Sequence, residues 1–197
     1  MEKNTIRLVQ EADAGEILSI YKPYIRETAI TFECEIPSIG EFRNRIKGIS
    51  ADYPYIVGLS NGKIVGYAYA HRQMERAAYQ WNAELSVYID KTHLRCGMGK
   101  ILYSTLIEIV KLQNVRNVYG GVTAPNENSE KLHEHLGFRK LGVYHNTGYK
   151  CKAWRDVMWF EKTIGDYDLK PRPFVSIKEI DTNIITEILN HHSNMIK

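Results

Sequence analysis

The stretch ELSVYIDKTHLRCGMGK, residues 84–100, decides the fold, because it joins a strand to a helix through a glycine turn. Its first six residues alternate apolar and polar side chains and are rich in β-branched and aromatic types, which predicts a strand over 84–89. The turn at 94–100 carries two glycines one residue apart and two cations. From Ile101 onward apolar residues recur at helical spacing, which predicts a helix that begins in this turn.

This glycine turn has the chemistry of a diphosphate-binding site. The first amides of a helix have no partner within the helix, and the helix dipole places partial positive charge there. Gly97 and Gly99 allow the backbone to approach an anion closely, while Arg95 and Lys100 add full positive charges. The alternative is that the glycines only shape a tight strand-to-helix connection, since Gly-x-Gly alone is a weak signal.

Two familiar nucleotide-binding fingerprints do not fit. No stretch matches Gly-x-x-x-x-Gly-Lys-Ser/Thr, the pattern of a phosphate-binding P-loop. A dinucleotide-binding fold needs a third glycine three residues after the second, and Leu102 occupies that place. We therefore expect a different kind of pyrophosphate site.

Composition and charge narrow the class of protein. The 197 residues are 44% hydrophobic and 25% charged, and the modest net charge of +3 lacks the basic stripe of a nucleic-acid binder. Cys34, Cys96 and Cys151 are too widely spaced for a disulfide framework or a zinc pattern. The first six residues lack a signal-peptide core. No apolar run approaches the roughly 20 residues that span a bilayer. We expect a cytoplasmic protein that binds neither nucleic acid nor membranes.

The rest of the chain reads as strands with helices inserted between them, which predicts an α+β (mixed α/β) fold. Asn61-Gly62 is a strong hairpin signal. A capping box at Ser38 and Glu41 opens one helix, and Asp13 resembles the start of another, which Pro23 should kink or interrupt. Strands are predicted over 6–9, 55–59, 63–70, 115–123, 138–149 and 153–160.

The C-terminal part differs in character from the rest. We expect a domain of residues 1–162 and an extension of residues 163–197. The extension contains a Pro-containing linker at 170–173. A capping box at Ser176 and Glu179 then predicts a short amphipathic helix, with Ile177, Ile180, Ile184 and Ile188 on its apolar face.

Several motifs in consistent order make the sequence similar to the GNAT superfamily of acyl-CoA-dependent N-acyltransferases. Within that superfamily it resembles the phosphinothricin (methionine sulfoximine) acetyltransferase branch. The resemblance runs from about residue 6 to residue 160. The stretches that carry it are residues 76–79, 84–89, 97–99, 126–138, 149–150 and 154–157.

The resemblance implies a mostly antiparallel twisted sheet flanked by helices, with acetyl-CoA as co-substrate and no metal. It places the pantetheine arm along the backbone of the central strand and the pyrophosphate on the amides of the glycine turn. Leu94 stands where the motif has Gln or Arg. Because backbone amides hold the pyrophosphate, we expect acetyl-CoA binding to survive this difference. The implied acetyl-CoA contacts are Val87, Tyr88, Ile89, Arg95, Cys96, Gly97, Met98, Gly99, Lys100, Asn126 and Ser129.

Two catalytic roles are also implied by the resemblance. Glu84 matches the proposed general base of the family, and a carboxylate can take the proton that an amine must lose before it attacks a thioester. The alternative for Glu84 is a salt-bridged surface carboxylate on a strand. His133 either donates a proton to the leaving thiolate or simply lines the CoA groove.

The acceptor pocket is implied at Phe32, Arg76 and Tyr79. A guanidinium there suits a carboxylate, phosphinate or sulfone oxygen, although Arg76 could equally be a solvated loop cation. We expect a small amino-acid-like amine as the acceptor. The alternatives are a protein N-terminus or lysine as acceptor, or a non-catalytic acyl-CoA-binding module. The resemblance further suggests a homodimer, with the final strands or the extension at its interface.

Overall fold

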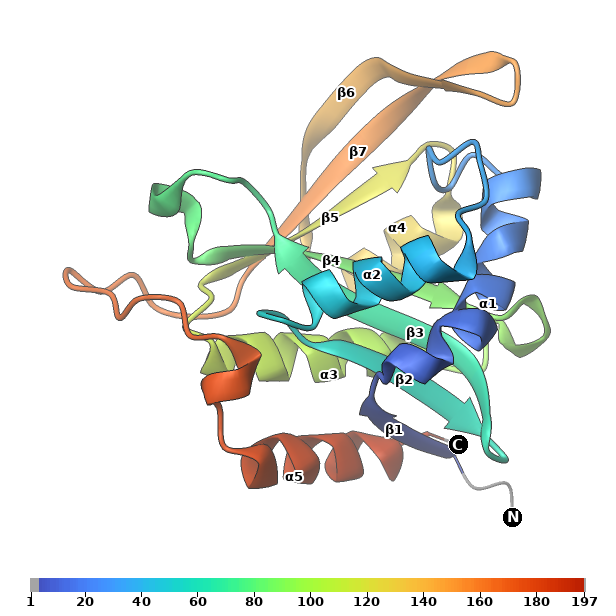
Figure 1. Ribbon diagram of the computed structural model, residues 1–197. Coiled ribbons are helices and arrows are strands. Elements are labelled where there is room, and N and C mark those ends of the chain that lie inside the picture. Colours follow the sequence, from blue (N-terminus) through green and yellow to red (C-terminus); the bar gives the residue numbers. More distant parts are fainter. Residues whose placement is uncertain (1–3, 197) are drawn as a thin grey trace.

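The computed structural model of the protein describes residues 4–196 and shows a single sheet with helices on both sides (Figure 1). Within this range seven strands lie in the order β1-β2-β3-β4-β5-β7-β6. All neighbours are antiparallel except β4 and β5, which run parallel. The strands are β1 Asn4–Leu8, β2 Tyr55–Ser60, β3 Lys63–Arg72, β4 Asn82–Ile89, β5 Asn117–Thr123, β6 Arg139–Lys150 and β7 Ala153–Thr163. Residues 1–3, in the stretch assessed for a signal-peptide core, and residue 197 of the extension lie outside the described residues.

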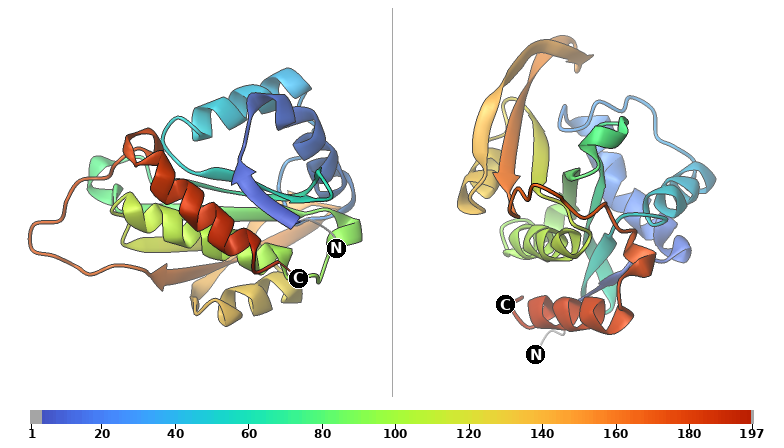
Figure 2. Two further views of the ribbon diagram at one scale, coloured as in Figure 1. Left: turned by 90° about the horizontal axis from the view of Figure 1, so that it is seen from below. Right: turned by 90° about the vertical axis from the view of Figure 1, so that its left-hand side faces the viewer.

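Five α-helices within residues 4–196 cover the sheet, and the views in Figure 2 separate them by face. α1 and α2 pack on one face, against side chains such as Tyr55 and Tyr67. α3 and α5 pack on the other face, and α4 lies beside β5. None of the helices in this range is long and apolar enough to span a bilayer. The helices are α1 Ala14–Glu27, α2 Ile39–Ile49, α3 Met98–Leu112, α4 Glu127–His135 and α5 Thr182–Ser193.

Local sequence signals account for several of these elements. Asn61 and Gly62 both take positive φ, 50° and 80°, and join Ser60 to its register partner Lys63, so the predicted hairpin is confirmed. The capping box of α2 is also confirmed: the Ser38 hydroxyl accepts the Glu41 N–H at 3.2 Å, and the Glu41 carboxylate accepts the Ser38 N–H at 2.7 Å.

The predicted start of the first helix is confirmed, because Asp13 is the N-cap residue of α1. Its carboxylate makes no capping bond to the helix, since it is already engaged by Arg7, at 2.6 and 2.8 Å, and by the Gln10 N–H at 2.7 Å. These bonds close a 3₁₀ turn, η1 Glu11–Asp13, ahead of the helix. Pro23 does not interrupt α1, since the helix continues to Glu27. Burial of its apolar face outweighs the single hydrogen bond that proline removes.

The helix of the C-terminal extension begins later than predicted. The capping box at Ser176 and Glu179 is present, but it closes only a 3₁₀ turn, η4 Ile177–Glu179. Ile180 is extended, and α5 starts at Thr182, where the Asp181 carboxylate accepts the Asn183 N–H at 2.8 Å. The residues that face the core in α5 are therefore set by its start at Thr182 and not by the turn before it. The buried face carries Ile185, Ile188 and Leu189, whereas Ile184 is 43% exposed.

Candidate active site

A wedge between β4 and β5 forms the candidate site. The two parallel strands are paired only from Asn82 to Glu84, opposite Asn117 to Tyr119. Beyond this point β4 continues to Ile89 and β5 to Thr123 without pairing to each other. Residues 85–89 therefore keep one strand edge free. An extended ligand that carries amide groups can form hydrogen bonds with the backbone there.

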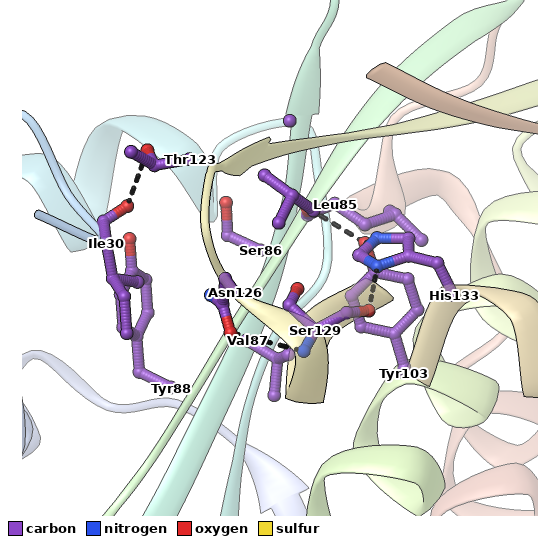
Figure 3. A pocket seen from close by; sticks show the side chains of 12 residues that line it. Ile30, Leu85, Ser86, Val87, Tyr88, Tyr103, Thr123, Asn126, Ser129 and His133 are labelled. Atoms are coloured by element: carbon purple, nitrogen blue, oxygen red, sulfur yellow. Dashed lines mark hydrogen bonds between the residues drawn. The ribbon is translucent and has the colours of Figure 1, made fainter. Parts of the chain in front are cut away.

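The cleft in this wedge is narrow, about 70 Å³, and suits an extended chain better than a ring system (Figure 3). Of the predicted acetyl-CoA contacts, it brings together Val87 and Tyr88 from β4 with Asn126 and Ser129 from the start of α4. Asn126 is the N-cap of α4, and its side chain accepts the Ser129 N–H at 3.3 Å. Sequence reasoning missed several other residues that line the cleft: Ile30, Ser86, Tyr103 and Thr123.

His133 lies in the wall of the cleft as a buried side chain. Its Nδ1 is 2.8 Å from the Ser129 carbonyl, so Nδ1 carries a proton and donates it there. Its Nε2 is 3.1 Å from the Tyr103 hydroxyl, which also lies 3.1 Å from the Leu85 carbonyl. Burial lowers the pKa of His133, partly offset by its bond to the Ser129 carbonyl, and this favours the neutral imidazole.

β5 makes room for His133 through a glycine. A Cβ on Gly120 would lie 2.2 Å from His133 Nε2 and 3.0 Å from the Tyr103 hydroxyl oxygen. The imidazole is also stacked on Phe160, with ring centroids 4.9 Å apart, and meets the edge of Phe138 at 5.1 Å. The position of His133 is therefore fixed, and it requires glycine at position 120 of β5.

Glu84 stands at the apex of the wedge, at the last position of β4 that is paired with β5. Its side chain lies on the face opposite His133, and its Oε1 would be 3.7 Å from a Cβ placed on Gly121. No residue in the range 4–196 forms a hydrogen bond or a salt bridge with the Glu84 carboxylate. Burial raises the pKa of Glu84, and the charge of His71 offsets part of that rise. The structure thus shows a partly buried, unpaired carboxylate rather than a salt-bridged one.

The glycine turn lies at the open end of the wedge and borders a wider pocket of about 530 Å³. Arg95 and Gly97 both have positive φ, 65° and 84°, and Gly97 is the N-cap of α3. A Cβ on Gly97 would meet no atom within 4 Å, so the space beside the turn is open. Cys96 turns away and donates its thiol to the His93 carbonyl at 2.8 Å. The pocket is lined by Ile89, His93, Leu94, Arg95, Gly97, Met98, Gly99, Lys100, Asn128 and Leu132.

The three predicted acceptor residues do not line one common pocket. Phe32 belongs to the loop between α1 and α2, and its ring packs on Gly148 of β6, where a Cβ would come within 2.4 Å of it. That loop is anchored at Thr31, whose carbonyl accepts the buried Lys150 ammonium at 2.7 Å. Arg76 and Tyr79 lie on the exposed connection between β3 and β4, which projects well away from that loop in Figure 1.

Comparison with known proteins assigns this geometry to a family. A family model for an acetyltransferase (GNAT) domain matches residues 6–159. The chain belongs to the GNAT acetyltransferase family. The phosphinothricin N-acetyltransferase of Streptomyces viridochromogenes is 31% identical to it over 177 residues, which cover 89% of this chain and 95% of that protein. The L-methionine sulfoximine/L-methionine sulfone acetyltransferase of Salmonella typhimurium is 26% identical over 83% of this chain and 96% of its own.

Solved GNAT structures share the fold. A GNAT superfamily phosphinothricin acetyltransferase from Sinorhizobium meliloti, solved in complex with acetyl-CoA, superposes with a TM-score of 0.83 at 31% identity. The match covers 88% of this chain and 95% of that one. As a GNAT enzyme, the protein is an acetyl-CoA-dependent N-acetyltransferase, and the predicted fold and reaction class are confirmed.

The residues of this chain fit acetyl-CoA as co-substrate. The free edge of β4 offers backbone groups to an amide-bearing arm, and the start of α3 offers amides and two cations to a diphosphate. Within residues 4–196, no three His, Cys, Asp or Glu side chains gather in a way that could hold a metal ion.

Proposed function

We propose that this GNAT enzyme transfers the acetyl group of acetyl-CoA to the primary amine of a small amino-acid-like acceptor, with Glu84 as general base. The observation that carries the proposal is the unpaired, partly buried Glu84 carboxylate at the apex of the β4–β5 wedge. The acceptors that relatives' names suggest are phosphinothricin, methionine sulfoximine and methionine sulfone.

In this proposal the pantetheine arm lies along Val87, Tyr88 and Ile89, and Asn126 and Ser129 contact it from α4. The amides of residues 95–100 hold the pyrophosphate, helped by the Arg95 and Lys100 charges. The free strand edge and the open space beside Gly97 support both placements. The same proposal takes residues 1–162 as the catalytic domain and 163–197 as an extension.

The reaction follows from these placements. The acceptor enters as an ammonium ion, gives a proton to the Glu84 carboxylate and attacks the thioester carbonyl as a free amine. A backbone N–H near Val87 stabilises the developing oxyanion. The carbon–sulfur bond then breaks, the thiolate takes up a proton, and the new amide nitrogen loses one. We assign His133 a positioning role, because its Nε2 faces the Tyr103 hydroxyl.

Phe32, Arg76 and Tyr79 are proposed to bound the acceptor side. Phe32 is fixed on Gly148 beside the cleft, whereas Arg76 and Tyr79 need their connection to fold inward. We also propose a cytoplasmic homodimer. The exposed aromatic side chains of the β6–β7 hairpin, Tyr144, Tyr149 and Trp154, support an interface there.

The test is an acetyl-CoA turnover assay with a panel of amino acids as acceptors, in which the release of free CoA thiol is measured. The panel contains methionine sulfone, methionine sulfoximine and phosphinothricin. Turnover with at least one of these, with an N-acetyl product identified by mass spectrometry, is the expected result. CoA binding without turnover on any panel member would redirect the assignment to a protein amine or to an acyl-CoA sensor.

A further inference from the structure

We propose that His71 is the proton acceptor that serves Glu84, passing the proton of the acceptor amine from the apex of the wedge to solvent. This inference rests on the proposed function, because it needs Glu84 to act as the base. It adds a positioning and relay residue that lies thirteen positions before Glu84 in the chain.

Strand register places the two residues opposite each other. His71 and Glu84 are direct partners in the antiparallel β3–β4 ladder. Directly opposite residues project from the same face, with Cβ atoms about 4.5–5.5 Å apart. Glu84 is the last residue of β4 that pairs with β5, so His71 stands next to the point where the cleft opens. His71 itself is only half-buried and has access to solvent.

The hydrogen bonds of His71 leave the correct nitrogen available. Its Nδ1 lies 2.9 Å from the Arg72 carbonyl, and a carbonyl can only accept, so Nδ1 carries the proton. Nε2 of the neutral ring is then a free base, and no residue in the described range 4–196 bonds to it. The ring also packs on Tyr69, with centroids 5.9 Å apart, which limits its rotation.

Other titratable groups near Glu84 cannot take a proton from it. They are phenols: Tyr69 on β3, Tyr103 on α3, and Tyr119, its register partner on β5. Burial raises the pKa of each phenol, so each keeps its own proton. Among these neighbours His71 alone has an unprotonated ring nitrogen that can accept a proton.

The relay is balanced in protons. Glu84 takes one proton from the acceptor ammonium and becomes a neutral acid. Nε2 of His71 does not touch the carboxylate, so it takes up that proton through a bridging water and becomes part of an imidazolium ion, which restores the Glu84 carboxylate. The imidazolium gives the proton to water or buffer. This matches the one proton that the reaction releases overall, since the thiolate recaptures the second proton lost by the amine.

His71→Phe tests the relay, because a phenyl ring keeps the contact with Tyr69 but cannot accept a proton. We expect kcat at pH 7 in weak buffer to fall about tenfold, within the range of acid–base effects, and added imidazole to restore it. The acidic limb of kcat/KM should also move to higher pH, because the imidazolium charge that favours ionised Glu84 is gone. His135→Phe, on the exposed surface of α4, is the matched control and should match wild type in both respects.

The outcomes separate the possibilities. A wild-type pH profile and unchanged kcat in His71→Phe would overturn the relay while leaving Glu84 as base. A loss of kcat with a lower Tm and no response to imidazole would also overturn it, in favour of a structural role. His71→Gln repeats the test if the phenylalanine variant does not fold. No turnover by wild type on any amine would overturn the proposed function and the relay with it.

Discussion

Gly120→Ala should disturb the wall of the cleft by direct collision. The new Cβ would lie 2.2 Å from His133 Nε2, more than 1 Å inside an ordinary contact of about 3.5 Å. The imidazole has nowhere to retreat, because Phe160 and Phe138 pack against it. Overpacking costs about 1–3 kcal/mol, and loss of the bond to Tyr103 costs about 1 kcal/mol more. Replacing glycine also lowers the conformational entropy of the unfolded chain, which stabilises the folded state by about 0.4–1 kcal/mol.

The net expectation is a loss of about 2 kcal/mol in the free energy of unfolding, from the terms above. For a chain of this size that lowers Tm by about 4–8 °C. Urea denaturation followed by tryptophan fluorescence measures it. Gly142→Ala is the matched control in another strand, where a Cβ meets nothing within 4 Å, and Gly121→Ala places its Cβ in ordinary contacts of 3.5–3.7 Å. Equal stability of Gly120→Ala and both controls would refute the reasoning.

Three further predictions concern the extension, the acetyl-CoA site and an ion pair. Ile188→Ala on α5 should cost about 2–5 kcal/mol, whereas exposed Ile184→Ala should cost almost nothing; equal effects in urea melts would contradict the observed packing of α5. Lys100→Ala should raise KM for acetyl-CoA about three- to tenfold with kcat retained, and Lys47→Ala on α2 should not; a loss confined to kcat would argue against phosphate binding. Burial acts to raise the pKa of the Asp13 carboxyl, but its hydrogen bonds and the Arg7 charge lower that pKa overall. The ionised carboxylate therefore stabilises the folded state above about pH 4, and this contribution fades as the pH falls further. The destabilisation by Asp13→Asn should therefore be full at pH 7 and shrink in acid; a constant difference between denaturation curves at pH 3 and pH 7 would contradict the linkage.

The sequence predicts those parts of the fold that local chemistry specifies. Asn61-Gly62 determines a hairpin because both residues tolerate positive φ, and the glycine turn predicts the start of α3 for a similar reason. The resemblance adds the mostly antiparallel sheet flanked by helices. Glu84 and the cleft residues Val87, Tyr88, Asn126 and Ser129 then lie around one wedge.

What the sequence could not supply depends on contacts distant in the chain. Tyr103 has the spacing of an ordinary core residue, and only the packing of α3 on β4 brings its hydroxyl to the Leu85 carbonyl and His133. His71 stands opposite Glu84 through strand register, which no local pattern reveals. In the extension, the prediction was wrong because a local signal was extended beyond the single turn that it specifies. The Ser176 capping box is real but spans one turn, and a second cap at Asp181 sets the phase of α5.

Glu84→Gln is the most direct test of the central claim that the wedge holds an acetyl-transfer site with a carboxylate base. CoA thiol release with the best panel acceptor should fall by about 10²–10⁴-fold in the variant, while calorimetry shows acetyl-CoA bound as tightly as by wild type. In wild type, kcat/KM should be lost on acidification at a higher pH than an ordinary glutamate would give, because the pKa of Glu84 is raised. A variant that keeps wild-type turnover at pH 7 would contradict the assignment of Glu84.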